Sequence, residues 1–395
     1  MRTAPLRKGW EGNVSSYELN LISDFSGKSR GGLLLCFYGS ATSWLQGCCK
    51  SVKFAGPDSA HAIIAYLCSR KNFLTVVCMN KICFMLLALV FASCASTEPE
   101  KRAAEGTYDG ELNILMLADA GRNGSYDQRL NAEWMGVYAD ALGPEFVISC
   151  GDLFHYQGIQ STADPLLWSN FESIYTHGEL QCPWYGVLGN HEYRGNTQAM
   201  MDYSEVSRRW NMPDRYYTLS VPLDDDEPDS ERVRFLFIDT APLIDKYRND
   251  PAQYPDVQEV DPDAEVRWID SVLRVSPERW KIVVGHHPMY TYDKKDDIEQ
   301  ENLRARLEEV FRRNGVDAYF CGHIHTFQHI RTGRDSIDYV VNTSASKQRA
   351  PQRGPLTQYA GEHSGFGLLS FDEGVMHYTL VNSRGELEYE IERRK

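Results

Sequence analysis

The segment FVISCGDLFHYQG, residues 146–158, decides the fold class and also raises the question of function. It starts as a short apolar run, which indicates a buried strand, and the run gives way to Asp152 and, three residues later, His155. An aspartate and a histidine at a strand end are either candidate metal ligands or polar residues on a loop. The number of similar strand ends in the chain decides between these two interpretations.

Apolar runs and helical patterns alternate along the chain from residue 112 onward. The apolar runs occupy residues 112–121, 146–152, 184–192, 232–240, 280–288 and 316–325. Helical periodicity is present at 128–143, 265–275 and 302–315, and the first and last of these close at a glycine. Strand–helix–strand order with continuous apolar strands predicts an α/β fold with a parallel sheet covered by helices. Short strands dominate after Tyr339 and predict a second sheet, mixed or antiparallel.

Most of these predicted strands end in residues that can bind a metal ion. In chain order they are Asp119, Asp152 with His155, Asn190 with His191, His286 with His287, and His323 with His325. The carboxyl ends of strands in open α/β folds meet where ligands bind. A lone buried histidine is more often a hydrogen-bonded core residue than a ligand. Five such segments at successive strand ends nevertheless predict a bound pair of metal ions.

A metal pair explains why these residue types occur together. Two divalent ions about 3.5–4 Å apart can bind both an attacking water and the phosphoryl oxygens of a substrate. Because the two ions repel each other, the site needs a shared negative group, and the Asp152 carboxylate is the natural bridge. Imidazoles favour transition metals, whereas carboxylate and amide oxygens accommodate harder ions. The mixed set therefore predicts Fe, Zn or Mn, in divalent or mixed-valence form.

The motifs at these strand ends resemble those of a known family. They are LADAG (117–121), GDLFH (151–155), GNHE (189–192), GHHP (285–288) and GHIH (322–325). They are similar to the five blocks of the calcineurin-like metallophosphoesterases, and in order and spacing most similar to the tartrate-resistant purple acid phosphatases. SRRWNMPDRYYTL (207–219) and FLFIDT (235–240) also match that subgroup. The resemblance covers roughly residues 108–389 and implies a four-layer sandwich of two mixed β-sheets flanked by helices.

The resemblance also implies a set of ligands and a reaction. One metal ion would be held by Asp119, Asp152, the residue at 155 and His325, and the second by Asp152, Asn190, His286 and His323. His191 corresponds to the histidine that contacts the substrate phosphate and can protonate the leaving alkoxide, a role that typically contributes about 10²–10⁴-fold. The implied activity is hydrolysis of phosphate monoesters by a metal-activated hydroxide.

The residue at position 155 departs from the family pattern. The purple enzymes have a tyrosine there, whose phenolate binds ferric iron and gives the colour, whereas this chain has His155 followed by Tyr156. Other members of the superfamily supply a histidine two residues after the first aspartate, where this chain has Gly121. We predict that His155 replaces both and favours a divalent ion. The alternatives are Tyr156 reaching in after a local shift, or a water molecule.

Further departures surround the motifs. Glu192 stands where the family usually has aspartate, and we predict that it orients neighbouring groups. His287 would either contact substrate or pack behind the ligands. Lys347, Arg349 and Arg353 follow VVNTSAS (340–346) and are predicted to form a solvated loop rather than a phosphate site.

The first quarter of the chain has a different character. Residues 79–94, MNKICFMLLALVFASC, have the layout of a secretory signal peptide, since their apolar run of about a dozen residues is shorter than the roughly 20 that span a bilayer. ASC also resembles the lipobox of bacterial lipoproteins, with ordinary cleavage near Ser93 to Ser96 as the alternative to a lipid on Cys94. Residues 1–78 are predicted to be upstream sequence or a disordered extension, 95–106 a tether and 107–395 the metallophosphoesterase domain. We therefore expect an exported protein, periplasmic or on the outer surface, attached to a membrane only through such a lipid.

Composition narrows the functions further. Residues 95–395 contain 31 Lys and Arg against 51 Asp and Glu, a formal net charge of −20, with no basic stripe, which disfavours nucleic-acid binding. Only three cysteines remain there, too few for a disulfide framework. The acidic run DDDEPDSE (224–231) is predicted to be a solvated turn, with calcium binding as the alternative. We expect a small phosphorylated substrate.

Two other functions compete with a phosphatase that acts on monoesters. A phosphodiesterase acting on cyclic nucleotides or other diesters would use the same dinuclear core. A surface binding lipoprotein with a degenerate site is the alternative from another class. Retention of six of the seven expected ligand types, together with His191, favours an enzyme, and removal of the metals would separate the cases.

Overall fold

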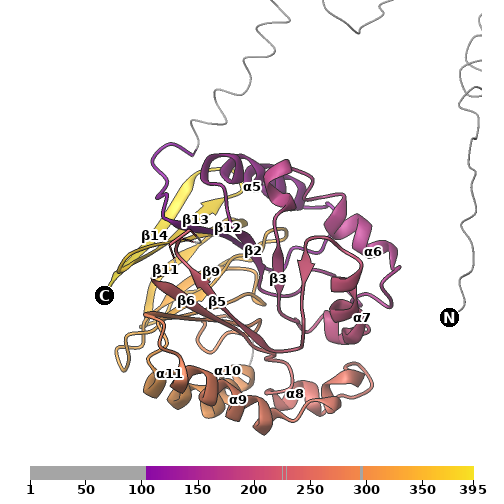
Figure 1. Cartoon of the computed structure of the whole chain (residues 1–395). Coiled ribbons are helices and arrows are strands. Elements are labelled where there is room, and N and C mark those ends of the chain that lie inside the picture. Colours follow the sequence, from indigo (N-terminus) through magenta and orange to yellow (C-terminus); the bar gives the residue numbers. More distant parts are fainter. Residues whose placement is uncertain (1–103, 225, 228, 294–296) are drawn as a thin grey trace, which may run out of the picture. The chain divides into compact units, whose positions relative to one another are not determined.

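The computed structural model describes residues 104–395 apart from 225, 228 and 294–296 (Figure 1). The extension expected at 1–78, the signal peptide expected at 79–94 with its Cys94, and most of the tether expected at 95–106 lie outside the described residues. Within the part of the chain that is described, no helix has the length and hydropathy that crossing a membrane requires.

Two seven-stranded mixed β-sheets form the centre of the domain. The first has the order β14-β13-β12-β1-β2-β3-β4 and the second β11-β9-β10-β8-β7-β6-β5. The strands of the first sheet are β1 (Leu112–Leu117), β2 (Phe146–Ser149), β3 (Trp184–Gly186), β4 (Trp210–Asn211), β12 (Gly365–Asp372), β13 (Val375–Asn382) and β14 (Leu387–Arg394). Those of the second are β5 (Tyr217–Pro222), β6 (Arg232–Phe237), β7 (Trp280–Val284), β8 (Ala318–Cys321), β9 (Phe327–Ile330), β10 (Asp338–Val341) and β11 (Thr357–Gly361).

Each sheet combines parallel and antiparallel pairs. β1 to β4 are parallel in the first sheet, and β6, β7, β8 and β10 are parallel in the second. The sequence had suggested that the late strands form a second sheet of their own, and this prediction is wrong. β12 instead pairs antiparallel with β1, so that the meander β12–β14 completes the first sheet, while β9 to β11 complete the second. The continuous apolar strands are divided between both sheets.

Helices cover the outer faces, which gives the four layers expected of a metallophosphoesterase sandwich (Figure 1). The helices associated with the first sheet are α5 (Gln128–Leu142), α6 (Pro165–Leu167) and α7 (Thr197–Asp202); those on the opposite side are α8 (Asp245–Arg248), α9 (Pro262–Val275), α10 (Ile298–Leu303) and α11 (Glu309–Asn314). Shorter helical turns are η2 (Trp168–Glu172), η3 (Gly178–Gln181), η4 (Glu192–Arg194), η5 (Tyr203–Glu205), η6 (Pro255–Glu259) and η7 (Arg304–Glu308). The predicted glycine stops are confirmed, because Gly143 and Gly315 both have left-handed backbone at helix ends.

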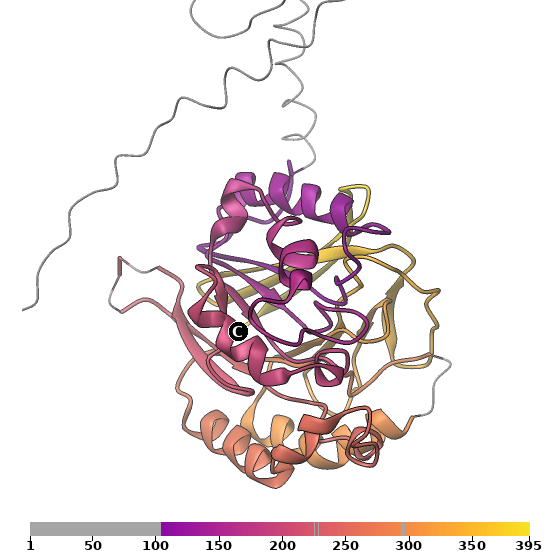
Figure 2. The same cartoon turned by 90° about the vertical axis from the view of Figure 1, so that its right-hand side faces the viewer.

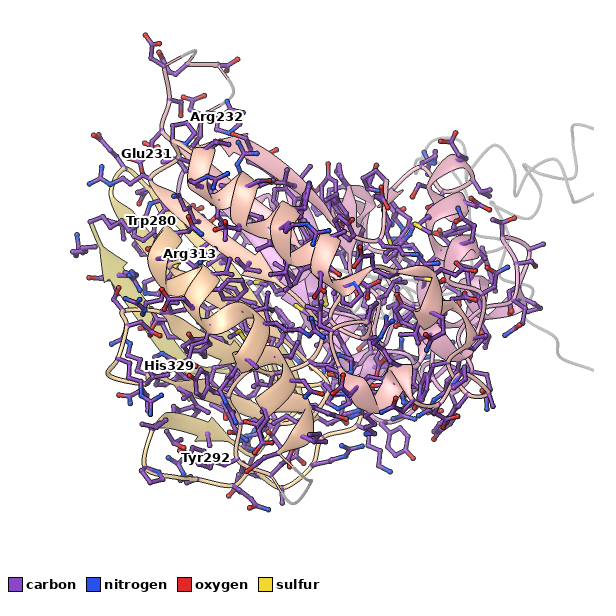
Figure 3. All side chains as sticks on the ribbon, turned by 90° about the horizontal axis from the view of Figure 1, so that it is seen from below. Glu231, Arg232, Trp280, Tyr292, Arg313 and His329 are labelled. Carbon is purple, nitrogen blue, oxygen red and sulfur yellow. The ribbon has the colours of Figure 1, made fainter. Side chains whose placement is uncertain are left out.

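Aromatic residues join the two sheets at the core. Phe235 of β6 packs edge-on against Phe146 of β2, with ring centroids 5.7 Å apart, and against Phe371 of β12 at 6.2 Å. On the outside of the second sheet, Arg313 of α11 pairs with Asp270 of α9 at 2.8 Å and ties the helical layer together (Figure 3). These contacts fix the sheets relative to each other, and therefore also the loops that follow their strands.

The acidic run lies on a hairpin that projects from the domain (Figure 2). The hairpin joins β5 to β6, and Asp224, Glu227 and Asp229 on it are exposed. The prediction of a solvated turn is thereby confirmed for Asp224, Asp226, Glu227 and Asp229, whereas Ser230 and Glu231 are half-buried.

Candidate metal centre

The backbone at the strand ends has an uncommon conformation. Asp119, Asp152, His323 and His325 all have positive φ, between 52° and 76°. Left-handed backbone is infrequent for residues other than glycine, and where it persists it tends to mark functional sites. The loops also approach closely, because a Cβ on Gly189 would lie 2.2 Å from Asp152 Oδ1. The sharp turns after the strands thus aim the predicted ligands at one another.

Asp119, His155 and His325 form one group of candidate ligands. Their ligand atoms lie within 4.8 Å of one another, and His325 Nε2 is 3.4 Å from Asp119 Oδ1. His325 Nδ1 donates to the Lys347 carbonyl at 2.6 Å, so Nε2 is the nitrogen that offers a lone pair. Burial lowers the pKa of His155 to about 2 and that of His325 to about 3, so both rings are neutral. Neutral imidazoles beside a carboxylate are suited to a metal ion.

Asp152 stands at the centre of the cluster. Its Oδ2 atom lies 3.3 Å from His286 Nε2, 3.5 Å from His155 Nε2 and 3.8 Å from His191 Nε2. Asp119, Asp152 and His286 also form a group within 4.8 Å. His286 Nδ1 donates to the Cys150 carbonyl at 2.8 Å, which turns Nε2 toward Asp152. Asp152 is therefore placed to be shared by ligand groups on both sides.

Several buried polar atoms in this cluster have no hydrogen-bond partner among the described residues. They are Asp119 Oδ1, both ring nitrogens of His155, Asn190 Oδ1 and His286 Nε2. Buried polar atoms are nearly always hydrogen-bonded, so a convergent set without partners needs an explanation. Carboxylate, amide and imidazole atoms of this kind fit transition-metal ions.

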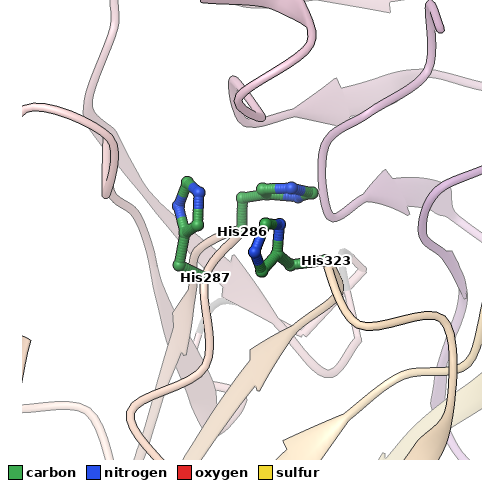
Figure 4. A group of neighbouring side chains, drawn as sticks. All are labelled: His286, His287 and His323. Atoms are coloured by element: carbon green, nitrogen blue, oxygen red, sulfur yellow. The ribbon is translucent and has the colours of Figure 1, made fainter. Parts of the chain in front are cut away.

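His287 forms a group with His286 and His323 whose ligand atoms lie within 4.8 Å of one another (Figure 4). His287 is fully buried, however, and both of its ring nitrogens are engaged. Nδ1 is 2.8 Å from Thr240 Oγ1 and Nε2 is 2.9 Å from the Tyr247 hydroxyl. These contacts are those of a packed residue, which is one of the two roles that the sequence leaves open for His287.

Tyr156 does not replace His155 in the cluster. Its side chain is 59% exposed, and the Arg122 guanidinium carbon lies 4.7 Å from its ring centre. Its backbone carbonyl accepts a hydrogen bond from His191 Nδ1 at 2.8 Å. Tyr156 thus contributes to the site through its backbone, while the His155 side chain lies beside Asp119 and His325.

His191 lies at the edge of the cluster. Its side chain is 14% exposed, and its backbone N–H donates to Asp152 Oδ1 at 2.9 Å. The bond from Nδ1 to the Tyr156 carbonyl leaves Nε2 on the side of Asp152 and the cavity. An imidazole held in this way can exchange a proton with a bound substrate.

Glu192 organises the loops beneath the cluster. It is buried, and its carboxylate accepts hydrogen bonds from the backbone N–H groups of Asp152 (2.9 Å), Phe154 (3.0 Å) and Gly189 (2.8 Å). One side chain therefore joins the loop after β2 to the loop after β3. The predicted orienting role is consistent with these contacts.

A small cavity of about 160 Å³ opens over the cluster and brings in residues that sequence reasoning missed. Besides Arg349 and the predicted site residues, which the sequence had pointed to, its lining contains Arg194, Lys246, Tyr247 and Tyr254. Arg194 lies only four residues after Asn190 and was open to prediction, whereas Lys246 and Tyr247 belong to no motif. A larger cavity of about 590 Å³ beside β5 contains no histidine and none of the site residues.

The loop after β10 differs in part from the expectation. Lys347, Arg349 and Arg353 are exposed, as a solvated loop requires. Arg349 nevertheless lines the cavity, because its backbone N–H donates to the His325 carbonyl at 2.8 Å and so holds the loop against the segment that carries this candidate ligand. Arg353 instead donates to the Ala360 carbonyl at 2.8 Å.

Fold, site and sequence comparisons agree on the class of protein. Residues 112–327 match the model of the calcineurin-like phosphoesterase family, and the chain belongs to this family. It is 33% identical to purple acid phosphatase 4 of Arabidopsis thaliana over 280 residues, which is 69% of this chain and 79% of the relative. It is 27% identical to human tartrate-resistant acid phosphatase type 5 over 271 residues, 65% of this chain and 81% of the relative. The chain is accordingly a hydrolase of the metal-dependent phosphatase class.

Solved structures support the fold. GAP50, the anchor in the inner membrane complex of Plasmodium, superposes with a TM-score of 0.62 at 21% identity, covering 72% of this chain and 88% of that one. Purple acid phosphatase PPD1 from yellow lupin gives a TM-score of 0.52 at 15% identity, covering 72% and 53%. At these identities the similarity concerns the sandwich alone.

The contacts of Glu192 lead to a stability prediction. Glu192→Ala leaves three buried N–H groups without their acceptor, and we expect it to lower the free energy of unfolding of the metal-free protein by about 3–5 kcal/mol. Denaturant unfolding measures this change. Exposed Glu205→Ala is the control and should stay within about 0.5 kcal/mol. A loss below about 1 kcal/mol for Glu192→Ala would contradict the assigned role.

Proposed function

We propose that the chain hydrolyses phosphate monoesters with a pair of metal ions, Fe, Zn or Mn. The residues that would hold them are Asp119, Asp152, His155 and His325 on one side, and Asp152, Asn190, His286 and His323 on the other. The observation that carries the proposal is the convergence of unpartnered buried ligand atoms around Asp152. When bound, such a pair neutralises phosphoryl charge and activates water.

The cations of the cavity support a monoester substrate. Arg194, Lys246 and Arg349 line a cavity that is only about 160 Å³ in volume. A terminal phosphate carries up to two negative charges, whereas a diester carries one, so three cations around a small cavity favour the monoester. The names of the acid phosphatase relatives point the same way. A diesterase remains the second candidate because the same ligand set serves both reactions.

His191 would act as the general acid. Its Nδ1 is held by the Tyr156 carbonyl, which leaves Nε2 to deliver a proton to the leaving alkoxide. Arg194 Nη1 lies 3.2 Å from His191 Nδ1 and limits the movement of the ring. Burial lowers the pKa of His191, so the ring gives up a proton readily, but only the form that is protonated at both nitrogens can deliver one from Nε2.

A degenerate binding protein fits the structure less well. Burial of unpartnered polar atoms destabilises a fold, and without a metal ion nothing offsets that cost. For residues 79–94 we propose a signal peptide that either carries a lipid on Cys94 or is cleaved near Ser93 to Ser96. A tether at 95–106 and a phosphoesterase domain at 107–395 would follow it.

Metal removal and return test the proposal directly. The chain is stripped with a chelator and refilled separately with Zn, Mn or Fe, and hydrolysis of an aryl phosphate is followed together with metal content. We expect turnover to disappear and return with a divalent metal at two ions per chain. Two bound ions without turnover would favour a diesterase or a binder, and fewer than one bound ion would refute the dinuclear site.

The role of His191 predicts a dependence on the leaving group. His191→Ala should lower kcat by about 10²–10⁴-fold for an alkyl phosphate, whose alkoxide needs a proton. The loss should be much smaller for p-nitrophenyl phosphate, whose leaving group departs without one. His177→Ala, at an exposed histidine, is the matched control. Equal losses on both substrates would contradict the assignment.

The assignment of His155 predicts a colour change. With ferric iron we expect the wild-type chain to lack the visible band of a tyrosinate–iron pair, and His155→Tyr to gain it because a phenolate then enters the site. Visible absorption of the iron-loaded proteins measures this. A wild-type band that is lost in Tyr156→Phe would instead identify Tyr156 as the ligand.

A further inference from the structure

Glu299 of α10 is a buried carboxylate that contacts both a candidate metal ligand, His323, and a cation of the cavity, Lys246. Its side chain is 8% exposed and accepts three hydrogen bonds: from His323 Nε2 at 2.9 Å, from the Tyr247 hydroxyl at 2.9 Å and from Lys246 Nζ at 2.5 Å. No motif pointed to this residue. A buried carboxylate normally needs such donors to remain charged.

The first of these bonds selects the form of His323. A carboxylate with three donors around it can only accept, so His323 Nε2 carries the ring proton. The lone pair of the neutral ring then resides on Nδ1. His323 therefore has a defined tautomer, as histidines that bind metals through one nitrogen commonly do when a carboxylate holds the other.

A chain of hydrogen bonds supports the carboxylate from behind. Because Tyr247 donates its hydroxyl proton to Glu299, the same oxygen accepts from His287 Nε2 at 2.9 Å. His287 Nδ1 then accepts from Thr240 Oγ1 at 2.8 Å. This explains why His287 is buried next to the ligands without being one: it fixes Tyr247, which fixes Glu299.

The remaining contact reaches the cavity. Lys246 lines the cavity over the cluster, and its side chain is 50% exposed, so its ammonium group is available to a bound anion. Lys246 belongs to α8, a helix of four residues that is joined to α10 by a hydrogen bond from Asp245 N–H to Asn302 Oδ1 at 2.9 Å. The same carboxylate thus holds a candidate metal ligand and a cavity cation.

We propose that Glu299 is a positioning residue shared by His323 and Lys246, which presents His323 Nδ1 to a metal ion and Lys246 Nζ to the substrate phosphate. The inference rests on the proposed function. It predicts that metal affinity and phosphate affinity both depend on Glu299, whereas only phosphate affinity depends on Lys246. A purely structural ion pair would change stability and neither affinity.

Three variants separate these roles: Glu299→Gln, Lys246→Met and the control Glu301→Gln, an exposed residue on the same helix. Zinc affinity of the stripped full chain is measured by competition with a chromophoric chelator, and inorganic phosphate is the inhibitor in the refilled protein. We expect Glu299→Gln to weaken one of the two zinc ions by about 10–100-fold and to raise the phosphate inhibition constant. Lys246→Met should raise only the inhibition constant, and Glu301→Gln should match the wild type.

The outcomes also distinguish this inference from the proposed function. A wild-type chain that binds two zinc ions, with Glu299→Gln binding both equally well, overturns the shared role and leaves the phosphatase proposal standing. A wild-type chain that binds fewer than one ion refutes both. If Glu299→Gln does not fold, Tyr247→Phe removes one donor and keeps the charge. Weaker zinc binding by several-fold in that variant supports the inference, and unchanged zinc binding overturns it.

Discussion

The rest of the site depends on one buried anion, the carboxylate of Asp152. It is 1% exposed, and imidazole nitrogens of three histidines surround its Oδ2 atom at 3.3–3.8 Å. Burial alone would raise the pKa of Asp152, but His286 and His191 hold it well below its usual range. A charge in such a place must be compensated, either by these rings or by metal ions. The left-handed backbone at Asp152 and the hydrogen bonds to Glu192 hold that carboxylate in place. There it lies between the candidate ligands His155 and His286.

Four histidines of the cluster are fixed from behind. In each of the four, one ring nitrogen is hydrogen-bonded to a backbone carbonyl or a carboxylate, so that the other faces the cluster. The pairs are His286 with Cys150 O, His325 with Lys347 O, His191 with Tyr156 O, and His323 with Glu299. Because each partner comes from a different part of the chain, the tautomers are set by the fold and not by the motifs. His155 is different, since neither of its nitrogens has a partner.

In the proposed site, histidine in place of tyrosine at position 155 would change the charge around the first metal ion. A phenolate there would give a set with three negative charges, whereas His155 would leave two, from Asp119 and Asp152. Ferric iron would lose more from this change than a divalent ion, because its interaction with an anionic ligand is stronger. In the structure His155, and not the Tyr156 ring, lies beside Asp119 and His325.

The sequence alone determined the strands and the candidate ligands. Apolar runs and turn residues are local patterns, so Asp119, Asn190 and His286 could be placed at strand ends without a structure. The division of the strands between two sheets could not be predicted, because the pairing of β1 with β12 joins segments about 250 residues apart. Nor could Lys246 and Glu299, which lie on short helices without a motif and reach the site only when α8 packs beside α10. Side chains that act through such long-range contacts leave no periodicity or spacing in the sequence.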